Sequence, residues 1–340
     1  MRRNKQRRIH QTGPASWRGP VDHVVILDGT MSSLEPGCET NAGLIWKLLD
    51  ELTPRTDLSV RYEPGLQWDS WRQVRNVIIG RGLNSQIQRA YGALASRWRP
   101  GDRIFLFGFS RGAYAVRSLA GVIDRVGLVR SDQATVRTIT AAYRLYRKAP
   151  EAEVTRAFSA AYCHEGVQVE MIGVFDTVKA LGLRAPLLWR YSQPHHAFHN
   201  HDLGRTTRHA FHALALNETR RAYEPVLWQT TPEQKATCVQ MWFRGTHGDI
   251  GGHQYCLSAC RPLANIPLVW MLENAAECQL PLPDDWRSRF PTDPDAPSAG
   301  LVRGWAKLFL NRARRPFGVD ASEQIHPTAQ PVSIPSSSSL

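Results

Sequence analysis

The segment from Arg103 to Gly112 constrains the fold of this 340-residue chain more than any other part of it. Its first half, Arg103–Phe107 (RIFLF), is apolar after the first residue, as is typical of a buried parallel strand. GFSRG follows directly, and a helix-compatible run, Ala113–Val126, begins at once. A G-x-S-x-G sequence between a strand and a helix indicates a sharp turn that presents its serine. Ser110 is therefore a candidate nucleophile, and a structural glycine turn with a solvent-facing serine is the alternative.

The rest of the chain alternates between strand-length apolar runs and helical spacing, which predicts an α/β protein with a mostly parallel sheet and helices on both faces. We expect further strands at His23–Leu27, Ser59–Tyr62, Val167–Phe175 and Cys238–Phe243. We expect helices at Asn41–Leu52, Asn84–Trp98 and Thr206–Asn217, more helix within residues 133–162, and a tight glycine-rich turn at Gly245–Gly252.

These elements predict a single domain over residues 21–319. Residues 177–204, rich in Pro, His and aromatic side chains, are interpreted as a helical or irregular cap that could act as a lid. The basic residues 1–20 and the Pro- and Ser-rich residues 320–340 are predicted to be disordered tails, because such compositions cannot bury a core.

A serine hydroxyl becomes a good nucleophile only when a base takes its proton, and the base in turn needs an acid to orient it. Asp176 and His247 each lie just past a predicted strand, and they follow Ser110 in the order acid, then base. Open α/β sheets place their sites at this edge. The alternatives are purely structural roles: Asp176 as a turn or N-cap acid, and His247 as a turn histidine hydrogen-bonded to the backbone.

Acyl transfer also needs N–H groups aimed at the developing oxyanion. The backbone N–H of Arg111, directly after the nucleophile, is the first candidate. The loop after the first strand supplies the second, from Gly29 or Thr30. Asp28 could order this loop or contact a substrate or cation, and Asp249, two residues after His247, is a second candidate for substrate contact.

The composition, with 42% hydrophobic and 21% charged residues, excludes a disordered chain, a collagen and a coiled coil. No apolar run is long enough to span a membrane and no signal peptide is recognisable, so we expect a cytoplasmic protein. The net charge of +12 is concentrated in a basic N-terminal tail, for which we expect loose contact with anionic membrane surfaces and no specific nucleic-acid binding. Six cysteines without a CxxC pair predict reduced thiols rather than a disulfide framework (Cys38, Cys163, Cys238, Cys256, Cys260 and Cys278).

In combination, several motifs resemble the DUF2235 hydrolases, which include the catalytic domain of Tle1-type phospholipase effectors of type VI secretion. They are DGT at Asp28, GFSRGAY with Arg117 following, FDTV, HALAL-x-E-x-R and WF-x-G-x-H-x-D-I-GG, and the match covers roughly residues 22–280. The resemblance implies an α/β-hydrolase fold and esterase or phospholipase activity. By motif position it also implies a triad of Ser110, Asp176 and His247.

The leading hypothesis is a serine hydrolase that acts on lipid or other carboxylic esters without a cofactor or metal. A non-catalytic hydrolase-fold binding module is the second hypothesis. The third is a metal-dependent phosphohydrolase that uses Asp28, Asp249 and histidines. Two groups have metal-ligating side chains at short spacing, although solvated loop histidines and buried thiols are the favoured explanation (His195, His196, His199 and His201; His253, Cys256 and Cys260).

Overall fold

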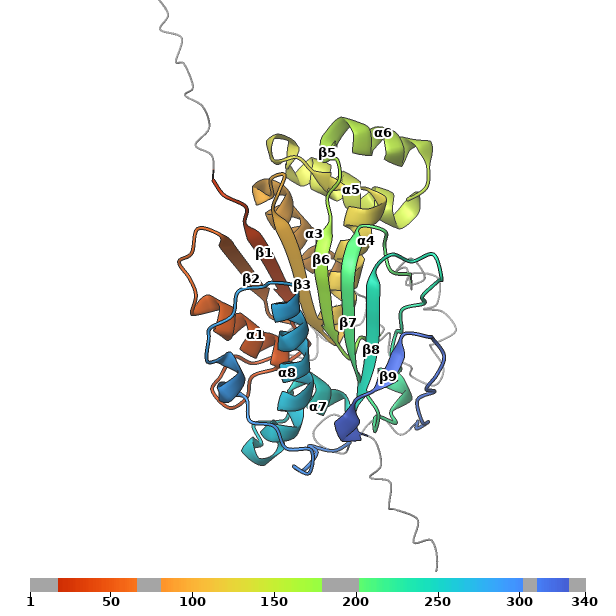
Figure 1. Ribbon diagram of the computed structural model, residues 1–340. Coiled ribbons are helices and arrows are strands. Elements are labelled where there is room, and N and C mark those ends of the chain that lie inside the picture. The colour runs from red at the N-terminus through yellow and green to blue at the C-terminus, as the bar shows by residue number, and fades with distance from the viewer. Residues whose placement is uncertain (1–17, 66–80, 179–201, 302–310, 330–340) are drawn as a thin grey trace, which may run out of the picture.

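A seven-stranded sheet forms the centre of the computed structural model, which describes residues 18–65, 81–178, 202–301 and 311–329 (Figure 1). Its strand order is β2-β1-β3-β6-β7-β8-β9, and each neighbouring pair is parallel. The strands are β1 (Asp22–Leu27), β2 (Leu58–Glu63), β3 (Arg103–Phe109), β6 (Val169–Phe175), β7 (Thr207–Ala215), β8 (Thr237–Phe243) and β9 (Glu323–Ile325). The predicted α/β class with a mostly parallel sheet is confirmed.

Helices cover both faces of the sheet (Figure 1). One face packs against α1 (Asn41–Asp50) and α8 (Arg261–Glu277), and the other against α3 (Arg81–Arg97), α4 (Arg111–Arg125) and α5 (Val136–Lys148). Along β3, Ile104 and Leu106 belong to the second of these cores, whereas Phe105 and Phe107 belong to the first. Burial on both faces explains why this strand is apolar throughout rather than alternating.

Outside the main sheet, residues 133–162 are largely helical, as predicted, and contain α5 and α6 (Glu153–Tyr162). A two-residue antiparallel pair, β4 (Leu128–Val129) with β5 (Cys163–His164), closes this excursion. It lies at the end of the sheet away from the short helix α7 (His247–Gly251) (Figure 1).

The helix predicted at Thr206–Asn217 is wrong, because this segment is strand β7. Its backbone is paired on both sides, with β6 and β8, and its last six residues are buried. A short apolar run fits a buried strand and a buried helix equally well. Here the segment forms a strand because it fills the position between β6 and β8 in the sheet. The predicted turn at Gly245–Gly252 contains the single helical turn of α7.

The predicted domain limits need correction at both ends. Strand β9 lies beyond residue 319 and pairs with β8, while Asp320 accepts hydrogen bonds from both the N–H and the hydroxyl of Thr230. At the other end, Arg18 forms two hydrogen bonds with the Asp102 carboxylate. Residues 1–17 and 330–340, and residues 179–201 of the proposed lid, lie outside the described residues.

Among the helices that the structure describes, none is both long and apolar enough to cross a bilayer. The basic residues of the N-terminal tail fall within residues 1–17, so the structure does not describe the segment for which membrane contact was expected.

The strand order reverses between β1 and β3, since β1 continues to β2 on one side while β3 lies on the other. In open α/β sheets, ligands bind outside the carboxyl ends of the strands at such a reversal. The loop after β1 begins at Asp28, and the residue after β3 is Ser110. The topology therefore predicts a binding site at this edge of the sheet, between the loop after β1 and the turn after β3.

Candidate active site

Three side chains form a continuous hydrogen-bonded chain at the carboxyl edge of the sheet. Ser110 Oγ lies 2.9 Å from His247 Nε2, and His247 Nδ1 lies 2.5 Å from Asp176 Oδ2. Ser110 follows β3, Asp176 follows β6, and His247 begins α7. All three residues are buried. The structure thus brings together the three residues that the sequence analysis selected.

The backbone at Ser110 has the conformation that a nucleophile turn requires. Its φ is +56°, in a region that non-glycine residues seldom occupy, and α4 begins at the next residue. A side chain at Gly108 would contact the backbone of Ala113 at 2.7 Å, and one at Gly112 would lie 2.0 Å from the carbonyl oxygen of Leu27. Both glycines therefore permit the close approach of helix, turn and strand.

Asp176 is fully buried and is held by an arginine that sequence reasoning missed. Arg315 Nη1 and Nη2 donate to its two carboxylate oxygens at 2.6 and 2.9 Å, and the N–H of Ala215 donates at 3.0 Å. Burial alone would raise the pKa of Asp176, but Arg315 and His247 hold it well below its ordinary value. The carboxylate is therefore kept ionised.

Arg315 also donates to the carbonyl oxygens of Ala215 and Tyr223, so its position is set by backbone as well as by Asp176. It lies 139 residues after its partner, and nothing in the local sequence distinguishes it from Arg312 or Arg314.

Packing and a second ion pair position His247. Its backbone N–H donates to Glu218 Oε2 at 3.2 Å, and Glu218 forms a buried bidentate pair with Arg220. The His247 ring packs against Phe109 and Tyr223, with ring centroids 4.9 and 4.6 Å apart. Glu218 and Arg220 are the acid and the arginine of the HALAL-x-E-x-R motif. The motif therefore marked two residues of the site to which the sequence analysis assigned no role.

The three residues named as oxyanion donors differ in what they offer. The Arg111 N–H is in the first turn of α4, where helix geometry provides no internal acceptor. The Gly29 N–H is engaged by the Asp28 carboxylate at 2.6 Å. Thr30 follows it, and its hydroxyl is buried without a hydrogen-bond partner in the described structure. This leaves the Arg111 and Thr30 groups as the stronger candidates.

Asp28 and Asp249 are buried carboxylates that hold their own loops together. Asp28 accepts from Thr40 Oγ1 at 2.5 Å and from Tyr62 OH at 2.7 Å, and its burial raises its pKa to about 6. Asp249 accepts from the N–H and hydroxyl of Thr246 at the start of α7. These contacts support the loop-ordering alternative for Asp28 and give Asp249 a comparable structural part rather than contact with a substrate.

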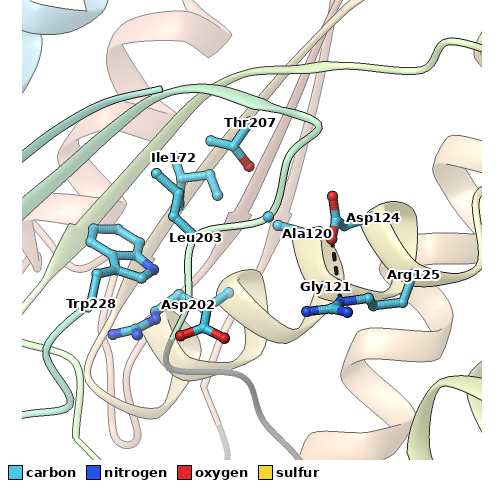
Figure 2. Close-up of a pocket in the computed structure, with 11 residues that line it drawn as sticks. Ala120, Gly121, Asp124, Arg125, Ile172, Asp202, Leu203, Thr207 and Trp228 are labelled. Atoms are coloured by element: carbon cyan, nitrogen blue, oxygen red, sulfur yellow. Dashed lines mark ion pairs between the residues drawn. The ribbon is translucent and has the colours of Figure 1, made fainter. Parts of the chain in front are cut away.

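Arg117, the arginine after GFSRGAY, is buried on α4 and binds the segment between β7 and β8. Its guanidinium lies 4.5 Å from the centroid of the Trp228 ring and donates to the carbonyl oxygens of Val226 and Leu227. Figure 2 shows the small cavity beside it, lined also by Asp124, Thr207 and Trp228. Its volume of about 20 Å³ suits a water molecule, and none of the three triad candidates lines it. The cavity is therefore separate from the three triad candidates.

The expectation of uniformly reduced cysteines is wrong, since Cys38 and Cys256 form a disulfide. The two residues are 218 positions apart, and spacing alone cannot reveal a pairing between distant loops. Because Cys256 is bonded, the proposed group of His253, Cys256 and Cys260 cannot supply that thiolate to a metal. No cluster of three or more potential metal ligands occurs within the described residues, and His195–His201 lie outside them.

The disulfide joins the loop after β1 to the segment after α7, and therefore ties the two sides of the site together. We expect its reduction to lower the free energy of unfolding by about 2–4 kcal/mol, measured by guanidinium unfolding with and without dithiothreitol. The double variant Cys38→Ser, Cys256→Ser is the control, and the reductant should not destabilise it further. Six alkylatable thiols in the untreated, unfolded protein would contradict the pairing.

Fold and site together describe an α/β protein with an α/β-hydrolase-like nucleophile turn. The chain belongs to the family of type VI secretion phospholipase effectors described as Tle1-like, catalytic domain, whose model matches residues 22–274. This membership supports a hydrolase of the lipase or esterase type.

Other similar proteins are more distant. The uncharacterized protein YEL023C of Saccharomyces cerevisiae is 26% identical over 238 residues, which are 62% of this chain and 33% of that protein. An uncharacterized protein from Pseudomonas aeruginosa has a TM-score of 0.45 and 16% identity, over 81% of this chain and 49% of that one. The Tle1 effector, solved with the VgrG spike of the type VI secretion system, has a TM-score of 0.36 and 15% identity, over 73% and 55%. The chain thus spans about a third to a half of the lengths of these relatives.

Proposed function

We propose that this chain is a serine hydrolase that cleaves the acyl esters of lipids, and of phospholipids in particular. The observation that carries the proposal is the connected set of Ser110, His247 and Asp176 at the strand-order reversal. Membership of a family of phospholipase effectors supports the lipid substrate.

In the proposed reaction, His247 Nε2 takes the proton of Ser110 as its oxygen attacks the ester carbonyl. Asp176 accepts from His247 Nδ1–H and stabilises the imidazolium that forms. The backbone N–H of Arg111 donates to the oxyanion, together with Thr30, whose hydroxyl is buried without a hydrogen-bond partner in the described structure. His247 then protonates the leaving alcohol, and water attacks the acyl-enzyme by the reverse proton path to release the fatty acid and restore Ser110.

The direct test is turnover of p-nitrophenyl esters of increasing chain length and of phospholipid in detergent micelles, each with and without EDTA. We expect hydrolysis that EDTA does not affect, with a chain-length profile that separates an esterase from a lipase. EDTA-sensitive turnover would support the metal-dependent phosphohydrolase instead. Absence of turnover on every ester by folded protein would support a binding module.

A further inference from the structure

A buried histidine that the proposed chemistry does not use binds the backbone next to the candidate acid. His212, on β7, is fully buried, and its Nε2 atom accepts the backbone N–H of Thr177 at 3.0 Å. Thr177 directly follows Asp176 and is also fully buried. A side chain of the neighbouring strand therefore holds the peptide that follows the carboxylate of the triad.

The partners of His212 determine which ring nitrogen carries the proton. Gln240 Nε2 donates to the carbonyl oxygen of Trp228 at 3.0 Å, and Gln240 Oε1 accepts the N–H of Trp228 at 2.8 Å. These two backbone bonds orient the amide, and its Oε1 atom lies 3.3 Å from His212 Nδ1. Because an amide oxygen can only accept, Nδ1 carries the proton, and the bare Nε2 is free to accept from Thr177.

The surroundings of the His212 ring keep it neutral. Burial is the largest cause that lowers its pKa, and the guanidinium groups of Arg117 and Arg315 lower it further, whereas Asp176 raises it. The resulting pKa is about 3. The ring therefore keeps its bare nitrogen at neutral pH, whereas a protonated imidazole would have no acceptor to offer the backbone.

The backbone of Asp176 needs such support. Its φ is +40°, in the left-handed region that non-glycine residues seldom adopt, and such a conformation persists only where the surrounding structure holds it. The Asp176 N–H donates to the carbonyl oxygen of Ala213 at 2.7 Å, and His212 binds the next N–H along. Strand β7 thus holds both peptides of a strained turn whose carboxylate lies 2.5 Å from His247.

We propose that His212 is a positioning residue of the candidate triad, which, as a neutral acceptor, fixes the peptide after Asp176 and so keeps the carboxylate against His247. This assignment rests on the proposed function. Without the acceptor, the N–H of Thr177 would be buried and unpaired, and the turn would gain free energy by rotating it toward another partner. The carboxylate would move with the turn, and His247 would lose its orientation.

The test removes the acceptor and compares the result with a variant that keeps one. His212→Phe should lower kcat for p-nitrophenyl esters about ten- to a hundredfold with little change in KM, because the orientation of the base matters in the transition state. His212→Gln, whose amide oxygen can accept from Thr177, should recover part of the loss. The matched control is His23→Phe, since His23 is buried at the start of β1, is bonded to Asp102 and lies at the opposite end of the sheet. It should lower Tm and leave kcat unaltered.

A double-mutant cycle separates positioning from a loss of stability. In the background of Asp176→Asn, which has no carboxylate to orient, His212→Phe should lower kcat by less than about threefold, while it lowers Tm as much as in the wild type. The same fold loss of kcat in both backgrounds would overturn the proposal.

Nuclear magnetic resonance of protein with ¹⁵N-labelled histidine needs no turnover. At neutral pH, His212 should show the neutral Nδ1–H tautomer, and His212→Phe should shift the Nδ1 resonance of His247, whereas His23→Phe should not. A proton on His212 Nε2, or an unshifted His247, would contradict the proposal. Turnover that does not require Ser110 would instead overturn the proposed function, and the resonances of His212 and His247 would still decide whether the ring positions the turn.

Discussion

Replacement of Ser110 by alanine is expected to lower kcat/KM for every ester substrate by a factor of about 10⁴ or more. The hydroxyl oxygen is the atom that forms the acyl-enzyme, and the methyl group of alanine offers no substitute. The variant should fold, because the strained turn is set by the backbone and by glycine packing. The substitution removes the hydrogen bond between Ser110 Oγ and His247. The measurement is initial-rate kinetics, together with labelling by a fluorophosphonate and mass spectrometry of the modified peptide.

The matched control is Ser118→Ala. Ser118 is also a buried serine of this region, on the same helix α4, and it donates to the carbonyl oxygen of Tyr114. We expect it to keep most of the activity and all of the labelling. The double variant Ser110→Ala, His247→Ala should be no slower than the single one, since residues that act as a unit are strongly non-additive. A loss of less than about tenfold in Ser110→Ala would sink the triad assignment.

The sequence was most informative where a local pattern reflects a local structure. An apolar run before GFSRG and a helical run after it predicted β3, the turn and α4, because both faces of that strand are buried and the turn needs glycine on either side of Ser110. The positions of Asp176 and His247 just past strand ends gave the remaining members, because parallel strands bring their carboxyl ends to one edge.

Prediction failed where structure depends on distant partners. Whether the segment of β7 forms a helix or a strand is decided by β6 and β8 on either side of it, and neither neighbour adjoins it in sequence. The Cys38–Cys256 disulfide and the Arg315–Asp176 pair join positions more than a hundred residues apart. The short β9, beyond the expected end of the domain, is stable because β8 offers a free edge to it.

Arg315→Met is expected to lower kcat/KM by about a hundredfold and to change its pH dependence. Arg315 is a positioning residue that acts through Asp176, whose two oxygens it holds with a side chain only 4% exposed. Desolvation raises the pKa of the buried Asp176 carboxylate, and Arg315 and His247 together lower it. Without the Arg315 guanidinium, only His247 and the remaining donors lower this pKa, so it rises from its depressed value. Asp176 then takes up a proton at a higher pH, and the acidic limb of the kcat/KM profile moves upward.

The size of the effect follows from the burial of the pair, since removal of one partner leaves an uncompensated charge in a site that excludes water. Arg315→Lys should restore part of the rate, and Arg312→Met, an exposed arginine three residues earlier, should change neither rate nor profile. A structural part alone would lower kcat/KM at every pH without moving the limb. In the background of Asp176→Asn, whose neutral side chain needs no cation, Arg315→Met should cost far less than in the wild type. Equal costs in the two backgrounds would show that Arg315 does not act through Asp176.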